Sequence, residues 1–535
     1  MADTLQRCEL LTPAAADVPE QVIGDVLGRA ARLGPADPLV RTVTPHEERV
    51  WTAAGLLADA ERVAAGLLAR HDPGARIATC LVNGPEAVLL QFGVALAGMV
   101  LVPVNPRSRG PELEHALRLS GAEAVYAAED AAGDPAADLA AEVAGRLPAL
   151  REVHRCTGDW RALRHDRTVD LPTVPPQGLA QIQFTSGTTG RAKGVQITHS
   201  GMVATSHAFR DRIGLPEGGV WVNPMPLFHT AGNVLGVMGA LWQRCEHVVV
   251  AFEPARVLEL ITQHRATLLS AAPTLLDLLM ARPEIGQADL SSLRVVFTGG
   301  QTVSPGFVDR VESAFAAPLI TTFGMTETCG SALLPAPTDP DPVRRTTVGR
   351  PLAGTGVRIA TPDGVPAAPG EVGELWLRGE RLTPGYYRDP EATAAAIDPG
   401  GWLHTGDLAV MDAAGACRIV GRLKDMIKTG GENVSPEEVE EAVVSHPSVA
   451  RAAVVGAPDE RWGELVVAFV VPEPGAAIDP AELERHCRAR LSPFKVPRAW
   501  RALEELPMTA STKVQRAELR RMAAADPALR PAVAP

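Results

Sequence analysis

The run FTSGTTGRAKG occupies residues 184–194 and combines three glycines, four hydroxyl side chains and Lys193. Glycine lets the backbone approach an anion closely, hydroxyl and amide groups donate to phosphate oxygens, and the lysine supplies positive charge. The P-loop spacing GxxxxGK[ST] is not met, because no Lys-Ser or Lys-Thr pair closes the run. A short glycine cluster is usually only a turn, but a run of this length predicts a polyphosphate-binding loop. Its expected ligands are Thr185, Ser186, Gly187, Thr188, Thr189, Gly190 and Lys193.

Helix-like and strand-like segments alternate on both sides of this loop. Apolar residues recur at helical spacing over 48–70, a strand-like segment follows at 77–81, and the alternation continues to about residue 298. Such alternation is typical of parallel sheets covered by helices. We therefore expect an α/β fold with a large N-terminal domain of parallel-rich sheets covered by helices.

The texture of the sequence changes twice toward the C-terminus. Short strands separated by turns predict a small β-rich subdomain over 348–422. Beyond it, Ser435, Pro436 and Glu438 form a pattern that predicts an N-cap at Ser435 and a helix to about His446. Strand-like segments around this helix predict a smaller α+β C-terminal domain.

Composition argues against several classes of partner. The 51 Lys and Arg residues are outnumbered by 63 Asp and Glu residues, without a basic stripe interleaved with aromatics, so nucleic acid is not an expected partner. Seven cysteines without a CxxC pair are typical of reduced thiols in a cytoplasmic protein. The N-terminus lacks the pattern of a signal peptide. The most apolar segment, 87–104, is interrupted by glycine and proline, so we expect a buried helix and strand there and no membrane span.

Further segments carry chemical groups in a fixed order along the chain. They are PLFHTAG at 226–232, TTFGMTE at 321–327, LHTGD at 403–407, GRLKDMIKTGGEN at 421–433 and PMTASTKVQR at 507–516. Together with the phosphate loop they resemble the adenylate-forming superfamily, which contains acyl-CoA synthetases, aryl-CoA ligases, luciferases and peptide-synthetase adenylation domains. The resemblance covers the chain from about residue 20 to about residue 520, and the pattern is most similar to acyl-CoA synthetases.

The resemblance implies a reaction, its cofactors and a division of the chain. The expected reaction is ATP-dependent conversion of a small carboxylic acid to an acyl-adenylate with release of pyrophosphate, then thioester formation with coenzyme A. ATP, Mg²⁺ and coenzyme A are the expected cofactors. An N-terminal adenylation domain would span 1–422, and a mobile C-terminal domain would span 423–535, with a hinge near Lys424.

Nucleotide contacts follow from the resemblance, residue by residue. Phe323 would lie on the adenine, Thr326 would touch a phosphate and Glu327 would help to hold Mg²⁺, a cation that prefers oxygen ligands. Thr322 is a further expected ATP/AMP-binding residue. Asp407 and its companion Arg422 would bind the ribose hydroxyls, because a carboxylate offers only acceptors.

The acyl group is expected beside a second set of residues. The resemblance places there His229, Ala231, Thr298, Gly299, Gly300 and Gly324, with Phe323 close by. In amino-acid-activating relatives an Asp that pairs with the substrate amine commonly follows the aromatic residue, whereas His229 stands here. This difference favours an acid without an α-amino group.

The C-terminal motifs imply the groups of both half-reactions. Lys513 would contact the reacting carboxylate and the α-phosphate, although Thr512 replaces the glycine that usually precedes this lysine. A β-branched residue is a poor substitute if that position needs a positive φ. The candidate catalytic residues are therefore Lys513, His229, Thr326, Glu327 and Lys428. Gly430 and Gly431 would line the channel for the thiol.

Three alternative functions stay open at this point. A freestanding adenylation enzyme that loads the phosphopantetheine of a carrier protein would share every motif. A nucleotide-binding regulatory or scaffold protein without catalysis is favoured only by Thr512. A luciferase-like oxygenase is compatible with the fold alone.

Overall fold

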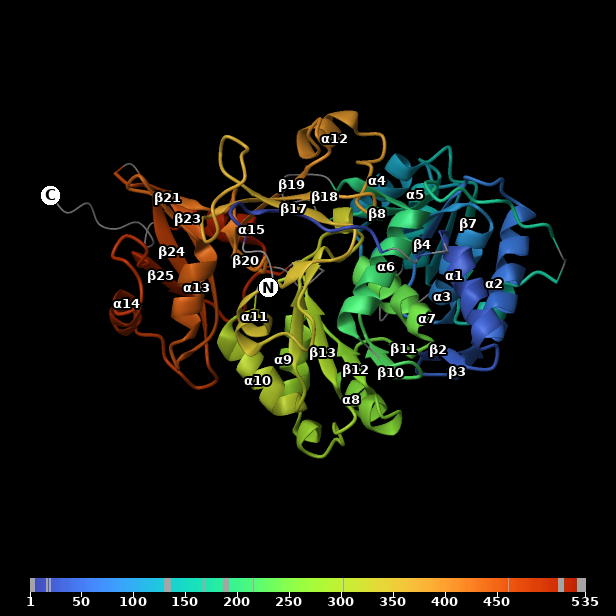
Figure 1. Cartoon of the computed structure of the whole chain (residues 1–535), viewed down its shortest axis with the longest axis horizontal. Coiled ribbons are helices and arrows are strands. Elements are labelled where there is room, and N and C mark those ends of the chain that lie inside the picture. Colours follow the sequence, from blue (N-terminus) through green and yellow to red (C-terminus); the bar gives the residue numbers. More distant parts are fainter. Residues whose placement is uncertain are drawn as a thin grey trace. The chain divides into compact units, whose positions relative to one another are not determined.

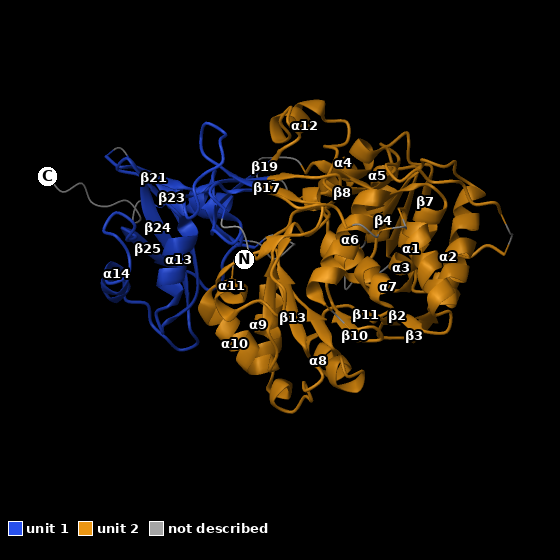
Figure 2. Ribbon diagram, viewed as in Figure 1, with its two compact units in different colours: residues 1–9, 358–376, 404–535 blue, residues 10–357, 377–403 orange. Residues whose placement is uncertain are grey.

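The computed structural model describes residues 5–15, 18, 21–128, 136–166, 169–185, 192–214, 216–301, 303–459, 461–508 and 514–526 (Figure 1). The chain divides into two compact units (Figure 2). Unit 1 comprises residues 1–9, 358–376 and 404–535, and unit 2 comprises residues 10–357 and 377–403. The functional boundary expected at 422/423 stays a prediction.

Unit 2 contains a seven-stranded sheet that is parallel except at its β3 edge. Its order is β14 (Leu319–Thr322), β13 (Val295–Gly299), β12 (Leu268–Ser270), β10 (Val220–Asn223), β11 (Glu246–Val250), β2 (Pro38–Val43) and β3 (Glu48–Thr52). Alternate residues face opposite sides, so Val222 packs with one apolar cluster and Trp221 with another.

A six-stranded sheet, also in unit 2, carries the phosphate-loop run. Its order is β7 (Glu152–Cys156), β6 (Ala124–Ala128), β4 (Arg76–Cys80), β5 (Val100–Pro103), β8 (Leu179–Phe184) and β9 (Gly194–Thr198). The first five strands are parallel, and β9 returns antiparallel to β8. The run of residues 184–194 therefore joins the last parallel strand to the antiparallel edge.

Helices of unit 2 lie between and outside these two sheets (Figure 1). The buried core between the sheets comes from α1 (Ile23–Leu33), α2 (Ala53–Leu68), α3 (Pro85–Leu96), α6 (His199–Ile213) and α7 (Gly239–Gln243). The outer face of the six-stranded sheet packs on α4 (Gly110–Ser120) and α5 (Ala136–Ala144). The outer face of the seven-stranded sheet packs on α8 (Pro254–Gln263), α9 (Pro273–Met280) and α10 (Pro305–Phe315). The expected parallel-rich sheets covered by helices are confirmed.

The β-rich part expected over 348–422 contains a five-stranded sheet. Its order is β1 (Glu9–Leu11), β17 (Gly356–Ala360), β18 (Gly373–Arg378), β19 (Leu403–Met411) and β20 (Cys417–Arg422). The helix α12 (Pro390–Ala396) stands between β18 and β19 in sequence.

The C-terminal part of unit 1 combines helices with one mixed sheet, as expected for an α+β domain. The strands run in the order β22 (Glu432–Val434), β21 (Ile427–Thr429), β24 (Gly463–Pro472) and β23 (Val449–Asp459), and β25 (Ala499–Ala502) pairs with β24. Its helices are α13 (Pro436–Val444), α14 (Pro480–Arg488) and α15 (Arg516–Ala525).

Two local expectations were wrong. The segment Glu48–Thr52 is strand β3, because it pairs with β2 along the sheet edge, and the helix begins only at Ala53. Helix α13 begins at Pro436 as expected, but the Ser435 side chain does not cap it. Its hydroxyl donates to the carbonyl of Val420 at 2.7 Å instead.

None of the described helices is long and apolar enough to cross a membrane. All seven cysteines are free, and all but Cys156 are buried.

Candidate functional site

Most of the expected nucleotide and acyl residues of unit 2 lie at the carboxyl ends of parallel strands. Thr185 follows β8, Gly299 ends β13, and Thr322 ends β14. Gly299 and Thr322 are direct neighbours in the β13–β14 ladder. The carboxyl edge of a parallel sheet is the usual place for ligands in α/β folds.

The two ends of the phosphate-loop run, Phe184 and Gly194, are held together by the β8–β9 pairing. The backbone N–H of Thr185 donates to the carbonyl of Lys193 at 3.1 Å. A ring nitrogen of His115 lies 2.8 Å from the carbonyl of Ala192, the residue before Lys193. The expected ligands Ser186, Gly187, Thr188, Thr189 and Gly190 lie outside the described residues.

Lys193 and Glu327 lie on opposite parts of one tyrosine side chain. The Lys193 ammonium is 4.8 Å from the centre of the Tyr386 ring. The hydroxyl of Tyr386 donates to Oε1 of Glu327 at 2.8 Å. The structure thus brings the loop lysine and the motif carboxylate into one cluster through a residue that the sequence did not single out.

A tight turn presents Thr326 and Glu327. Both begin the 3-10 helix Thr326–Thr328, which ends at Cys329 in the left-handed region with φ of 54°. The carbonyl of Glu327 accepts a hydrogen bond from the N–H of Thr383 at 2.8 Å. Glu327 is only 5% exposed, so this charged residue is buried.

Thr322 and Phe323 belong to a hairpin that backs this turn. The N–H of Phe323 donates to the carbonyl of Leu333 at 3.0 Å, and the Thr322 hydroxyl donates to the same carbonyl at 2.9 Å. A Cβ at Gly324 would collide with the carbonyl of Gly330. Glycine at position 324 therefore has a packing reason, because the hairpin backbone closes there.

His229 and Ala231 lie on a segment beside β8. The side chain of Gln183 on β8 donates to the carbonyl of Phe228 at 2.6 Å. His229 is exposed, and its Nδ1 accepts a hydrogen bond from the N–H of Ala231 at 3.3 Å. Ala231 opens the π-helix Ala231–Met238, a rare element that is frequent at functional sites.

The remaining acyl candidates differ in their surroundings. Thr298 is 1% exposed, and its hydroxyl has no hydrogen-bond partner among the described residues. A Cβ at Gly299 would lie 2.6 Å from Cγ2 of Thr322, whereas Gly300 has a φ of 82° and open space on its Cβ side. Gly299 is therefore needed for close strand packing, and only Gly300 leaves room.

Asp407 and Arg422 form an ion pair in unit 1. They face each other across β19 and β20, and Nε of Arg422 lies 2.7 Å from Oδ1 of Asp407. Asp407 is 4% exposed, while the Arg422 side chain is half exposed.

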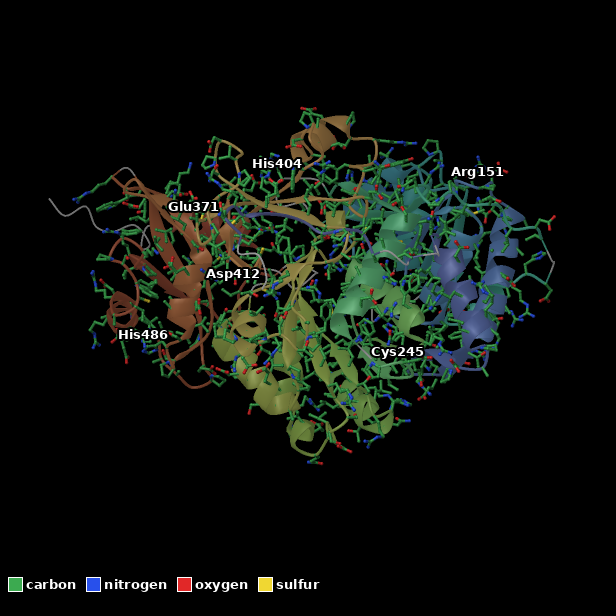
Figure 3. The ribbon with its side chains drawn as sticks, viewed as in Figure 1. Arg151, Cys245, Glu371, His404, Asp412 and His486 are labelled. Carbon is green, nitrogen blue, oxygen red and sulfur yellow. The ribbon has the colours of Figure 1, made fainter. Side chains whose placement is uncertain are left out.

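The turn before Asp407 is held by Glu374. Oε1 of Glu374 accepts the N–H of Gly406 at 3.0 Å, and the Thr405 hydroxyl donates to the carbonyl of Leu375 at 2.7 Å. The ring of His404, labelled in Figure 3, stacks on Trp376 with 4.0 Å between centroids. These contacts join the TGD turn to strand β18.

The expected hinge and thiol-channel residues also lie in unit 1. Lys424 follows β20, and burial lowers the pKa of its ammonium. Lys428 is exposed on β21. Gly430 and Gly431 form the turn to β22 with φ of 61° and 86°, values that favour glycine. A Cβ at Gly430 would lie 2.9 Å from the Trp462 ring.

Lys513 and Thr512 lie outside the described residues, so their surroundings add nothing to the expectation from sequence. Sequence reasoning also missed two residues. Tyr386 lies 59 positions from its partner Glu327, and Glu374 lies 32 positions from Gly406. No local spacing could have indicated either pairing.

The described residues contain no cluster of three or more His, Cys, Asp and Glu side chains that could hold a metal by themselves. Glu327 nevertheless fits an Mg²⁺ ion that is bound mainly by phosphate oxygens, because such ions commonly take only one or two protein carboxylates. Among the described residues, the side-chain partner of its Oε1 is the uncharged hydroxyl of Tyr386.

Comparison with known proteins agrees with this architecture. The family described as AMP-binding enzyme matches residues 29–387, and the AMP-binding enzyme C-terminal domain matches residues 438–513. A feruloyl-CoA synthase of Amycolatopsis is 36% identical over 505 residues, which cover 94% of this chain and 99% of that protein. A 3-[(3aS,4S,7aS)-7a-methyl-1,5-dioxo-octahydro-1H-inden-4-yl]propanoyl:CoA ligase of Mycobacterium tuberculosis is 36% identical over 506 residues, which cover 91% and 97%.

Solved structures of related enzymes are similar in fold. The anthranilate CoA ligase AuaEII in complex with anthranoyl-AMP superimposes with a TM-score of 0.86 at 26% identity. The match covers 94% of this chain and 97% of that one.

Proposed function

The chain belongs to the AMP-binding enzyme family, and we propose that it activates a carboxylic acid as an acyl-adenylate and passes the acyl group to coenzyme A. The observation that carries the proposal is the cluster of Lys193, Tyr386 and Glu327 at the carboxyl edge of the six-stranded sheet. The cluster offers a positive charge for the polyphosphate, from Lys193, and a carboxylate for its divalent cation, from Glu327. The relatives named as CoA ligases support the thioester as the product.

The chemistry explains why both signs of charge are needed. A carboxylate is a poor electrophile, and joining it to AMP first requires two anions to meet. Lys193, Lys513 and the amides of the phosphate loop would offset that repulsion and hold the α-phosphate in line with the acid. Mg²⁺, held by Glu327, would supply further charge stabilisation at the phosphates. Thr326 would donate its hydroxyl to a phosphate oxygen.

The nucleoside would be held by groups that differ in polarity. Phe323 would contact the adenine, Thr322 would be a further nucleotide contact, and Asp407 would accept hydrogen bonds from the ribose hydroxyls. Arg422 supports this role of Asp407, because their ion pair at 2.7 Å fixes the orientation of the carboxylate.

Thioester formation is the second half of the proposal. We assign the adenylating domain to 1–422 and the mobile domain to 423–535, with rotation about Lys424. The rotation would withdraw Lys513 and bring up the turn of Gly430 and Gly431, with Lys428 beside it. The positive φ values of both glycines suit a turn that approaches a pantetheine arm closely.

The acid would lie near His229, Ala231, Thr298, Gly299, Gly300 and Gly324. The exposed His229 replaces the Asp that amino-acid activators use, so we propose an acid without an α-amino group. The names of the relatives given above carry unlike acyl groups, a feruloyl group in one and a substituted indenyl-propanoyl group in the other. A screen therefore has to cover aryl, alicyclic, fatty and dicarboxylic acids.

A pyrophosphate-release assay tests the proposal. The enzyme is incubated with ATP, Mg²⁺ and each acid, and pyrophosphate, phosphate and ADP are measured separately. We expect acid-dependent pyrophosphate and acyl-AMP. Acid-dependent ADP, or no acid-dependent product across the screen, would contradict the proposal.

Coenzyme A and a phosphopantetheinylated carrier protein are compared as acceptors in a second assay. We expect the thioester to form with free coenzyme A. Transfer to the carrier protein alone would make the enzyme a freestanding loading enzyme. Free cysteines throughout the chain fit our proposal of a cytoplasmic location.

A further inference from the structure

Tyr386 connects two groups of the proposed site that come from different parts of the chain. Its ring lies under the Lys193 ammonium at 4.8 Å, and its hydroxyl donates to Oε1 of Glu327 at 2.8 Å. Lys193 precedes β9, and Glu327 belongs to the turn after β14. One side chain thus contacts both a cation and a carboxylate.

The backbone around Tyr386 is clamped on both sides. The N–H of Tyr386 donates to the hydroxyl of Thr393 at 2.9 Å. The carbonyl of Gly385 accepts the N–H of Gln196 at 3.1 Å, and the N–H of Tyr387 donates to the carbonyl of Gly194 at 2.7 Å. Because the two neighbouring peptide groups bond to β9, the base of the side chain is fixed relative to that strand.

A phenol is well suited to hold a carboxylate that must stay negative. The Tyr386 hydroxyl is an uncharged donor to Oε1 of Glu327. It orients Oε1 without neutralising the carboxylate. An arginine or lysine at the same place would pair with Glu327 and compete with a metal cation for it.

We propose that Tyr386 is a positioning residue that holds the Glu327 carboxylate for the divalent cation and keeps Lys193 at a set distance from it. The inference rests on the function proposed above. It predicts that the hydroxyl and the ring contribute separately. The hydroxyl governs cation affinity through Glu327, and the ring governs the placement of Lys193 at the nucleotide.

The hydroxyl is tested with Tyr386→Phe against the matched control Tyr387→Phe, which removes the same group from the adjacent residue. Free Mn²⁺ is measured by electron paramagnetic resonance during titration of enzyme with a non-hydrolysable ATP analogue. Loss of a hydrogen bond to a charged group predicts roughly 10-fold weaker Mn²⁺ binding for Tyr386→Phe. The control should bind as the wild type does. Equal binding by both variants and the wild type overturns the inference.

The route through Glu327 is tested with the double variant. If Tyr386 acts through that carboxylate, adding Tyr386→Phe to Glu327→Gln produces no further loss of Mn²⁺ affinity. Independent losses that multiply would overturn this route. Thermal unfolding of each variant distinguishes a positioning role of Tyr386 from a structural one. A merely structural tyrosine would lower the unfolding temperature on substitution but leave the cation affinity of the folded protein unchanged.

The ring is tested with Tyr386→Leu, which removes both contacts. We expect it to weaken binding of the metal-free nucleotide several-fold, whereas Tyr386→Phe leaves that binding intact. Equal nucleotide binding by the two variants overturns the role of the ring. Failure of the proposed function looks different, because the wild-type enzyme would then release no acid-dependent pyrophosphate, whatever Tyr386→Phe does to Mn²⁺ binding.

Discussion

Glu374 accepts a hydrogen bond from the backbone N–H of Gly406 at 3.0 Å, and this bond holds the turn that leads to Asp407. The other oxygen of Glu374 accepts the indole N–H of Trp376 at 2.8 Å. Gly406 has a φ of 70°, so the turn depends on a conformation that the flanking strands do not impose. Glu374, a residue of strand β18, thereby fixes the position of the turn from which the proposed ribose-binding carboxylate of Asp407 extends.

Glu374→Ala should raise the KM for ATP by about 5- to 10-fold with a smaller change in kcat, because it removes two hydrogen bonds that orient the turn and touches no reacting atom. Initial rates over a range of ATP concentrations check this. Glu371→Ala is the matched control, since Glu371 lies in the loop before β18 and only accepts the N–H of Ala368. An unchanged KM for ATP in Glu374→Ala would remove the positioning role.

The use of lysine in this chain is selective. The chain contains five lysines, and Lys193, Lys424, Lys428 and Lys513 all stand at candidate site positions. The fifth, Lys495, forms an exposed ion pair with Glu438. Arginine supplies nearly all other positive charge, so Lys495 is a natural control for each lysine substitution.

Lys513→Ala should lower acyl-AMP formation by at least about 100-fold, because a charge that acts on the reacting carboxylate and α-phosphate is lost. Thioester formation from supplied acyl-AMP should change little. The two half-reactions are measured separately, with Lys495→Ala as the control. Normal adenylation by Lys513→Ala would show that Lys513 is not the lysine that acts in this step.

Thr512→Gly tests the departure from the usual motif. If the position before Lys513 needs a positive φ, glycine removes a conformational cost and should raise the adenylation rate. A rate that is unchanged or lower would indicate that threonine is accommodated without strain.

Lys424→Pro should form acyl-AMP but transfer the acyl group slowly. Proline holds φ near one value and restricts the preceding Leu423, so a rotation absorbed by these dihedrals would be blocked. Lys424→Ala removes the charge alone and should transfer normally. Equal loss of both half-reactions in the proline variant, or slow transfer in the alanine variant, would show that Lys424 is not a pivot.

Two buried histidines should make unit 2 less stable in mild acid. Burial lowers the pKa of His199 to about 4 and that of His247 to about 3, from 6.5. The unfolded chain therefore binds more protons below pH 6.5, and stability falls as the pH falls. Each histidine should cost about 1 kcal/mol between pH 7.5 and pH 5.5.

Urea unfolding at several pH values checks this dependence. His199→Gln should flatten the slope of stability against pH, because its side chain does not titrate. The exposed His46 offers a control, and His46→Gln should leave the slope as it is. An identical slope for His199→Gln and the wild type would contradict the account.

Contiguous runs of residues carried most of what could be predicted. The eleven residues 184–194 indicated a phosphate loop because their glycines and hydroxyls act through neighbouring backbone, and the alternation of helix and strand indicated parallel sheets because apolar periodicity is a local property. The order of the later motifs then identified the family, which the match over residues 29–387 confirmed.

Partners distant in sequence came only from the tertiary structure. The Tyr386–Glu327 and Glu374–Gly406 bonds join residues 59 and 32 positions apart, so neither leaves a pattern in the intervening chain. The segment Glu48–Thr52 became a strand because β2 lay beside it to accept its backbone bonds, although its own periodicity favoured a helix. Hydrogen bonds between distant segments depend on how sheets and turns stack, and that information is held by no single stretch of sequence.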